Sequence, residues 1–325
     1  HHSPRHNHST TAPRGTTPPP LTEAQPLHHR SLRCERSEPR RVINRTSCND
    51  VPKASGSPRA AEQTHYDGGM LTVLSPAKSL DFSTRVPTPR RDTARLLDES
   101  AALIAVMAVK SPEEVAELMG ISDDLAHLNA TRYRVWDPEH TRRNARQAVF
   151  AFNGDVYQGF DARSLDARDL TEATKTVRIL SGLYGLLRPL DLIQPHRLEM
   201  GTRLTTSRGK SLYDWWGTTI TDLLREDLAA SPGPGVLVNL ASAEYFKAVD
   251  VERLGVPVVS PRFEDRDTDG VPRIVSFHAK RARGTMAAWM VRNRVRSVAR
   301  LRTFDGDGYA LDEARSTRLA PVFVR

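Results

Sequence analysis

The sequence predicts a single α+β body over residues 70–325, in which a mixed β-sheet is flanked by helices and a helical hairpin is embedded at about 111–136. Three observations lead to this fold class. Short β-prone runs occur at 71–74, 176–180 and 236–240. Amphipathic stretches with helical spacing lie between these runs. The apolar content of 38% is typical of a soluble protein with a substantial core.

Composition narrows the class of function. The net charge of +8 makes nucleic acid or another polyanion a plausible partner. Both cysteines, Cys34 and Cys48, precede residue 70, so the body has no thiolate for a disulfide, a metal ion or peroxide sensing. No apolar run approaches the length of a membrane span, so we expect no membrane partner.

Residues 1–69 differ in composition from the rest of the chain. They are rich in Pro, Ser, Thr, His and Arg and poor in large apolar side chains, which predicts a disordered leader. They contain no apolar segment of the kind found in secretory signals. We expect this segment to be a dispensable extension that is not native to the protein; a functional basic tail is the alternative.

The first elements of the body follow from local patterns. Residues 71–74 are predicted to form a strand that ends at Ser75-Pro76. Lys78 lies on the turn that follows, where it meets either a phosphate or solvent. Residues 90–108 have the spacing of an amphipathic helix. Residues 145–152 are mostly apolar and lead into a turn at Asn153-Gly154-Asp155.

Residues 111–136 predict two helices joined by a tight turn. A capping box and a proline at the first helical position start one helix, and Gly120 ends it. Ser122 then caps the second helix. A hairpin of this kind can hold a DNA phosphate on free amides without reading bases. The two carboxylates of Asp123 and Asp124 would repel that phosphate, so a plain helical hairpin is the alternative.

The stretch from Ile179 to Gly201, ILSGLYGLLRPLDLIQPHRLEMG, combines glycines, prolines, buried apolar residues and many polar ones. It predicts a buried element that runs into a rigid turn lined by polar groups, which is a common setting for a binding site. The alternative is a packed internal connection whose polar groups pair with one another.

The remaining elements are predicted in order along the chain. We expect a helix at 165–173, a helix at 210–224 that begins with Tyr213, Trp215 and Trp216, and a buried strand at 236–240 followed by a helix that carries Glu244, Tyr245 and Lys247. The two tryptophans belong either to the core or to a surface that stacks on bases. Strands are expected at 256–260, 274–277 and 321–325, with a charged hairpin at 265–270.

Residues 278–302 contain eight Lys and Arg residues and no acid, and they predict a basic helix. The spacing of Arg292, Arg296 and Arg300 would place these three side chains in one stripe on that helix. A basic stripe can neutralise DNA phosphates and give salt-dependent binding. A solvated helix paired with acids elsewhere is the alternative.

Five stretches together resemble the YaaA family of peroxide-stress proteins. They are the Ile179–Gly201 stretch, LSPAKSLDF (74–82), FNGDVYQGF (152–160), LYDWWG (212–217) with VNLASAEYFKAV (238–249), and IVSFHAKRARGTMA (274–287). The resemblance begins at Met70, which we therefore interpret as the natural start. It implies a bacterial cytoplasmic protein that limits damage from peroxide and free iron and binds DNA through a helix-hairpin-helix.

Two sets of candidate residues follow. The DNA-binding set contains the hairpin tip and the basic run: Gly120, Ile121, Ser122, Lys280, Arg281, Arg283, Arg292, Arg296 and Arg300. The second set would form a polar cleft suited to a nucleotide-like substrate: Lys78, Asn153, Asp155, Arg188, Gln194, Arg197, Glu199, Tyr213, Asn239 and Glu244.

The leading hypothesis is a monomer that binds duplex or branched DNA without base specificity. The alternative is an enzyme that acts on a nucleotide-like small molecule in the cleft. No catalytic residue can be named, because the sequence has no P-loop and no sequential triad. His196 and Glu199 alone are too few ligands for a metal ion, so neither a metal nor a cofactor is expected.

Overall fold

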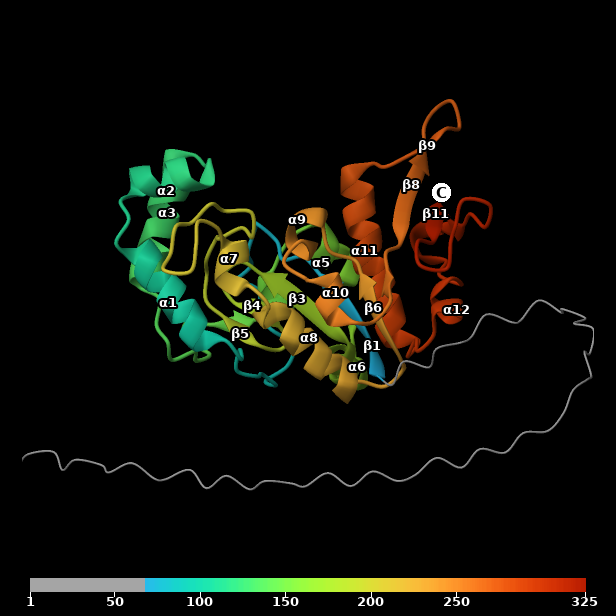
Figure 1. Ribbon diagram of the computed structural model, residues 1–325, viewed down its shortest axis with the longest axis horizontal. Helices are drawn as coiled ribbons and strands as arrows, with labels where there is room; N and C mark the ends of the chain where they lie inside the picture. The colour runs from blue at the N-terminus through green and yellow to red at the C-terminus, as the bar shows by residue number, and fades with distance from the viewer. Residues whose placement is uncertain (1–67) are drawn as a thin grey trace, which may run out of the picture. The chain divides into compact units, whose positions relative to one another are not determined.

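The computed structural model describes residues 68–325, and these form one α+β body. Its main sheet has five strands in the order β4-β3-β1-β6-β7 (Figure 1). These strands are β1 (Gly68–Leu74), β3 (Val177–Ser181), β4 (Gly185–Leu187), β6 (Pro234–Asn239) and β7 (Val258–Val259). Strands β3, β1, β6 and β7 are parallel, and only β4 is antiparallel to its neighbour. The predicted fold class is confirmed.

Two smaller sheets accompany the main one. A four-stranded sheet has the order β10-β11-β8-β9, and a two-stranded sheet pairs β2 with β5. Their strands are β2 (Arg146–Gln147), β5 (Leu192–Ile193), β8 (Arg262–Arg266), β9 (Pro272–Arg273), β10 (Ala310–Leu311) and β11 (Val322–Val324). The charged hairpin predicted at 265–270 is the connection between β8 and β9.

Helices surround the main sheet. Helix α8 lies across its front in Figure 1 and contacts β1, β4 and β6, while α6 and α11 contact β1 as well. The helices before Gly182 are α1 (Leu97–Ala108), α2 (Pro112–Met119), α3 (Asp123–Arg134), α4 (Ala148–Ala151), α5 (Asp155–Phe160) and α6 (Ala167–Thr176). Those after it are α7 (Leu212–Trp216), α8 (Thr219–Ala230), α9 (Ala243–Phe246), α10 (Val251–Leu254), α11 (Ser276–Arg292) and α12 (Val298–Leu301).

The hairpin at 111–136 has the two predicted helices and the predicted caps of α2, whereas Ser122 precedes α3 without making a side-chain capping bond. The Ser111 amide donates to Glu114 Oε2 at 2.7 Å and the Glu114 amide donates to Ser111 Oγ at 3.3 Å, which completes the capping box. Gly120 ends α2 with a φ of 58°, a conformation that glycine adopts at little cost. Tyr133 on α3 anchors the hairpin, because its hydroxyl donates to the carbonyl of Arg197.

Four local predictions are wrong, and tertiary contacts explain the first. The helix expected from residue 90 begins only at Leu97, because Asp92 pairs with Asp191 as an isolated bridge. The helix expected at 210–224 is two helices, since Gly217 adopts φ 45° and ψ −119° between them. The strand expected at 274–277 does not form, because residues 274–275 link β9 to α11 and α11 begins at Ser276; Ile274 and Phe277 are exposed.

The fourth wrong prediction is the long basic helix. Helix α11 ends at Arg292, and Arg294 has a φ of 49°, which no helix continues through. Arg296 therefore lies between helices and Arg300 lies on α12, so the three arginines do not form one helical stripe. The predictions about residues 1–67 lie outside the described residues. Strand β1 already begins at Gly68, two residues before Met70, where the body was expected to start.

Candidate functional site

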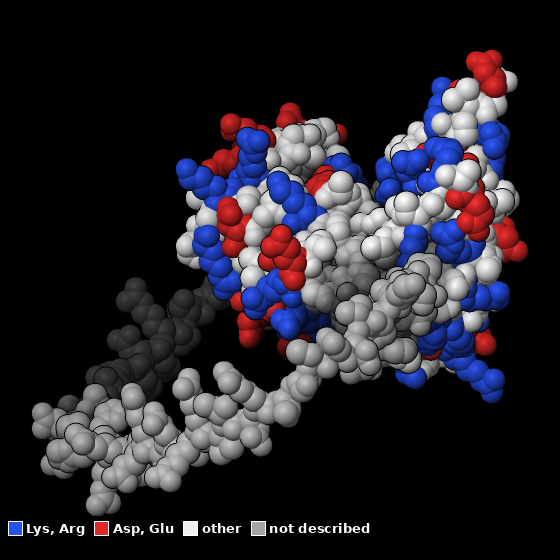
Figure 2. All heavy atoms as spheres, turned by 45° about the vertical axis from the view of Figure 1, so that its right-hand side comes forward, with Lys and Arg blue, Asp and Glu red and all other residues white. Residues whose placement is uncertain are grey.

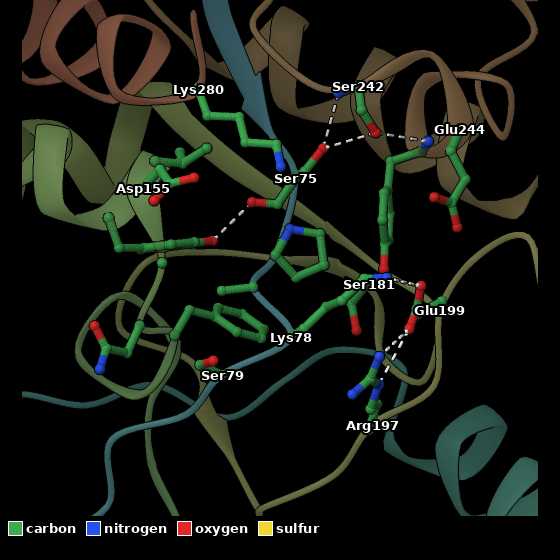
Figure 3. Close-up of a pocket in the computed structure, with 18 of the residues that line it drawn as sticks. Ser75, Lys78, Ser79, Asp155, Ser181, Arg197, Glu199, Ser242, Glu244 and Lys280 are labelled. Carbon is green, nitrogen blue, oxygen red and sulfur yellow. Dashed lines mark hydrogen bonds and ion pairs between the residues drawn. The ribbon is translucent and has the colours of Figure 1, made fainter. Parts of the chain in front are cut away.

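A cavity of about 500 Å³ opens where three neighbouring parallel strands end. Ser75 follows β1, Ser181 is the last residue of β3, and Ser242 comes shortly after β6 (Figure 3). The carboxyl ends of parallel strands are the usual place for a ligand in α/β sheets, because the connecting loops converge there. The topology of the main sheet therefore explains why these three serines meet.

Ser75 is held by hydrogen bonds from two sides. The Ser242 amide donates to Ser75 Oγ at 2.8 Å, and the two serine hydroxyls lie 3.3 Å apart. The hydroxyl of Tyr157 donates to the Ser75 carbonyl at 3.0 Å. Burial raises the pKa of Tyr157 well above its ordinary value, so this phenol is a neutral donor at physiological pH.

Glu199 organises the opposite side of the cavity. Its Oε2 lies 2.8 Å from Lys78 Nζ, and its Oε1 accepts from Arg197 Nε at 3.1 Å. Figure 3 shows this group pointing toward the cavity from the segment after β5 and from the turn after β1. Two cations therefore neutralise one carboxylate, and Lys78, whose side chain is 66% exposed, can turn toward a ligand.

Glu244 lies at the cavity rim and is fixed by the backbone. Its Oε1 accepts from the Gly201 amide at 2.9 Å, and a side chain at Gly201 would approach this oxygen to 3.0 Å. The Tyr213 hydroxyl donates to the Glu244 carbonyl at 2.9 Å. Tyr213 thus supports α9 from outside and is not itself a lining residue.

Lys280 and Arg283 reach the cavity from α11. Figure 3 shows Lys280 extending toward Ser75. Among the described residues, neither side chain has a hydrogen bond or an ion pair, although Asp155 also lines the cavity. Burial lowers the pKa of Arg283, because no acid compensates its charge. The cavity therefore presents two cations without an anionic partner.

Two glycines bring α11 this close to the cavity. A methyl group at Gly284 would lie 1.8 Å from the Val156 carbonyl oxygen on α5, and one at Gly159 would lie 2.1 Å from the Arg281 carbonyl oxygen. Any side chain at either position would push the two helices apart. The close contact of α5 with α11 sets the place from which Lys280 and Arg283 enter the cavity.

His196 forms part of the cavity lining but does not carry a charge. It is buried, and desolvation lowers the pKa of its imidazole to about 4. Its Nδ1 lies 2.8 Å from the carbonyl oxygen of Gln194, which fits a neutral ring that donates from Nδ1. His196 therefore contributes a neutral polar surface near Phe152, whose ring centroid lies 6.4 Å from the imidazole.

A second hollow of about 500 Å³ adjoins the cavity on the side of the helical hairpin. Its lining includes Met119 and Gly120 at the hairpin tip and Arg203 after the Ile179–Gly201 stretch. Glu199 and Glu244 line both hollows. The hairpin tip and the cavity are therefore neighbours on the surface.

Comparisons of the sequence with known proteins identify its family. A family model described as "Peroxide stress protein YaaA" matches residues 70–315. The UPF0246 protein of Delftia acidovorans is 54% identical over 258 residues, or 79% of this chain and 98% of the relative. That of Alcanivorax borkumensis is 50% identical over 256 residues, with the same coverage.

The chain belongs to the YaaA family of peroxide stress proteins. Every part of the cavity lies inside the matched region. The resemblance inferred from five short stretches is thereby confirmed over the whole body of the protein.

The cavity unites six of the ten cleft residues predicted from sequence, namely Lys78, Asn153, Asp155, Arg197, Glu199 and Glu244. Tyr213 acts from behind. The other three lie elsewhere because closer partners bind them. Arg188 Nε donates to Asp191 at 3.0 Å, Gln194 Nε2 donates to the Asp137 carbonyl at 2.5 Å, and Asn239 Oδ1 accepts from the Ala241 amide at 3.0 Å.

The predicted DNA-binding residues divide into separate groups. Gly120, Ile121 and Ser122 form the hairpin tip, and Lys280 and Arg283 line the cavity. Arg281 lies on α11 between these two cations but approaches Asp307, with Nε 3.8 Å from Oδ2. Arg292 donates to Ser164 Oγ at 2.5 Å, Arg296 pairs with Glu172, and Arg300 donates to Thr303 at 3.2 Å.

Sequence reasoning missed the serines and tyrosines of the cavity. The sequence predicts Ser75 only as the end of a strand, and Ser242 and Tyr245 only as part of the polar segment that follows another strand. Neither these three nor Tyr157 and Ser181 are among the predicted site residues. The signal that would have found three of them is a serine at or just past the end of each parallel strand. Small hydroxyl residues are so common in loops that this signal needs the strand order to become specific.

Family membership does not by itself assign chemistry to the site. In residues 68–325 no three His, Cys, Asp or Glu side chains cluster as metal ligands would. No helix in that part of the chain is long and apolar enough to cross a membrane. What the YaaA-family cavity offers is two uncompensated cations, several hydroxyl donors and a neutral aromatic wall.

Proposed function

We propose that the protein binds DNA through the phosphate backbone, without reading base sequence, and that this binding limits damage during peroxide stress. One observation carries the proposal. The hairpin tip lines a hollow next to the cavity that holds Lys280 and Arg283, and Glu199 and Glu244 line both spaces. One strand of a DNA duplex laid across this surface would reach both the hairpin tip and the cavity.

The two elements would contribute differently. Helix α3 has 12 residues, and its N-cap Ser122 makes no side-chain capping bond, so amides at its start are open to a phosphate. Asp123 and Asp124 are exposed in the same turn and weaken this contact by repulsion. Most of the binding energy must then come from basic side chains on the other side of the hollow.

The basic side chains needed for such binding lie on the part of the molecule formed by β8, β9 and α11. Figure 2 shows a hollow between two raised parts of the surface, with Lys and Arg side chains on the wall of one of them. Exposed basic residues of this segment include Arg262, Arg266, Arg273 and Lys280. Contacts of this kind position DNA without specifying its sequence.

Displacement of cations gives a physical link to peroxide damage. Protein cations that neutralise DNA phosphates release the counterions condensed there. Ferrous iron bound to the backbone would be among these counterions, and its reaction with peroxide would then occur away from the DNA. The link to iron rests on this physical reasoning, and the link to peroxide stress rests on family membership.

Binding measurements on two matched variants test the proposal. We expect similar affinity for unrelated duplex sequences, and an affinity that falls steeply as salt rises. Ser122→Asp keeps a good N-cap but adds a charge at the hairpin tip, and should weaken binding about threefold to tenfold. Ser111→Asp makes the same change at the far end of α2 and should have little effect. A flat salt response, or equal effects of both variants, would contradict the proposal.

The cavity itself favours a second candidate, an enzyme that acts on a nucleotide-like small molecule. Hydroxyl, carboxylate and cationic groups converge at the ends of β1, β3 and β6, and a space of about 500 Å³ suits a small molecule. A duplex backbone would cover this space without filling it. Retention of a nucleotide through purification, or its turnover, would support this candidate.

A further inference from the structure

We infer that the cavity binds a nucleoside phosphomonoester, with its phosphate between Lys280 and Arg283 and its base against the aromatic wall. The inference deepens the proposed function, because the ligand is either a free mononucleotide or the phosphorylated end of a DNA strand. Both sources carry the same chemical group.

Arg283 indicates that the ligand is an anion. Its guanidinium is partly buried, and no described residue forms an ion pair with it or accepts a hydrogen bond from it. Removing a charge from water without a partner is costly, so such a group is expected to have one in the functional state. Lys280, one helical turn before it, lines the same cavity and is also unpaired. Two cations three residues apart suit a dianionic phosphomonoester better than a single carboxylate.

Arg281 shows that this arrangement is specific to one side of α11. It lies between the two cavity cations in sequence, yet it is exposed and its guanidinium lies near Asp307. The close contacts that Gly159 and Gly284 make with the backbone of the opposite helix fix the orientation of α11, and this orientation separates the side chains. Arg281 is therefore a matched control with the same charge on the same helix.

The rest of the cavity lining indicates that the ligand carries a nucleoside. Phe152 and Tyr157 lie with ring centroids 5.3 Å apart, and Tyr245 and Leu240 add further apolar surface. Aromatic side chains of this kind stack on bases of any sequence. Asp155 lines the cavity without a hydrogen-bond partner among the described residues, and its carboxylate can accept from a sugar hydroxyl. A volume of about 500 Å³ is within the range of small-molecule sites.

Calorimetric titration with dAMP tests the inference, with deoxyadenosine and orthophosphate as partial ligands. We expect dAMP to bind more tightly than either fragment. Arg283→Gln and Lys280→Gln should each weaken dAMP about tenfold or more, as expected for loss of a charged hydrogen bond. Arg281→Gln should change affinity less than about twofold. Arg143→Gln is a second control, because Arg143 lines a different hollow that is rich in arginine.

Variant stability must be measured in parallel. If Arg283→Gln fails to fold, Arg283→Lys and the exposed Lys280→Gln still decide the question. Undiminished dAMP binding in folded Lys280→Gln and Arg283→Gln would overturn the inference, as would an equal loss in Arg281→Gln or no binding of dAMP to the parent protein.

Three DNA substrates separate this inference from the proposed function. A covalently closed minicircle has no ends, a blunt duplex with 5′-phosphates has both features, and the same duplex with 5′-hydroxyls lacks the phosphomonoester. Preference for the phosphorylated duplex identifies strand ends as the source; dAMP binding without that preference identifies a free nucleotide. Minicircle binding without dAMP binding leaves the DNA proposal standing and defeats the inference, and the reverse result does the opposite.

Discussion

Both halves of the basic run at 278–302 contain several Lys or Arg residues and no acid, but their environments differ. In the first half, Lys280 and Arg283 line a cavity and have no partner among the described residues. In the second half, Arg294 lies 2.7 Å from Asp169, and Arg296 pairs with Glu172. The sequence of a basic segment therefore reports its charge but not whether that charge has a partner in the fold. Acids more than 100 residues away decide this.

The first prediction concerns the contact between α5 and α11, which positions the first half of the basic run. Gly284→Ala places a methyl group 1.8 Å from the Val156 carbonyl oxygen, which is backbone and cannot give way without moving α5. We expect a loss of about 3 kcal/mol or more in the free energy of unfolding, measured by denaturant titration. Gly270→Ala is the control, because open space surrounds that position and only its φ of 78° is unfavourable. Equal costs for both variants would show that the helix contact is not tight.

A second prediction concerns the pH dependence of the cavity lining. The pKa of His196 is about 4 in the folded protein and 6.5 ordinarily, so the unfolded chain binds the proton more readily. The contribution of neutral His196 to the free energy of unfolding is therefore fully present above pH 6.5. It is lost as the pH falls toward 4, by about 3 kcal/mol at most.

His196→Gln isolates this term, because it keeps a donor for the Gln194 carbonyl and does not titrate. Between pH 7 and pH 4, the free energy of unfolding of the parent should fall by roughly 2–3 kcal/mol more than that of the variant. Parallel curves for the two proteins would mean that His196 is hydrated and the cavity lining is more open than described.

Arg296→Ser tests the structural role of the second half. Its partner Glu172 has a side chain that is only 9% exposed, so removing Arg296 leaves a nearly buried carboxylate unpaired. We expect a cost of about 1–2 kcal/mol, discounted because Arg296 itself is partly exposed. Arg300→Ser should cost about 0.5 kcal/mol, since its guanidinium lies 5.5 Å from the Trp289 ring at an exposed site. Thermal melting of both variants decides whether pairing distinguishes them.

Sequence patterns were most reliable where local chemistry determines the structure. The capping box at Ser111, the stop at Gly120 and the strands at β1, β3 and β6 follow from residue type and spacing. Predictions failed where a distant partner decided the outcome. Asp92 pairs with Asp191 and prevents an early helix start, and the backbone at Arg294 ends the basic run as a helix.

The candidate site follows the same division. Lys78, Glu199 and Glu244 could be anticipated because they follow strands or lie in a stretch dense in polar residues. Ser75 and Ser242 could not, because their meeting depends on β1 lying between β3 and β6. Free and paired arginines also look alike in sequence, which is why the stripe at 292–300 was predicted.

The salt dependence of DNA binding tests whether Lys280 and Arg283 contact DNA while Arg292, Arg296 and Arg300 do not. The first two have no partner among the described residues, whereas the other three bind Ser164, Glu172 and Thr303. The measurement is the slope of log Kd against log salt concentration for three proteins, each below its melting temperature. They are the parent, the double variant Lys280→Gln with Arg283→Gln, and the triple variant in which Arg292, Arg296 and Arg300 are changed to Ser. We expect the double variant to flatten the slope by about two phosphate equivalents and the triple variant to leave it unchanged. A slope flattened by the triple variant and unaffected by the double one would contradict this expectation.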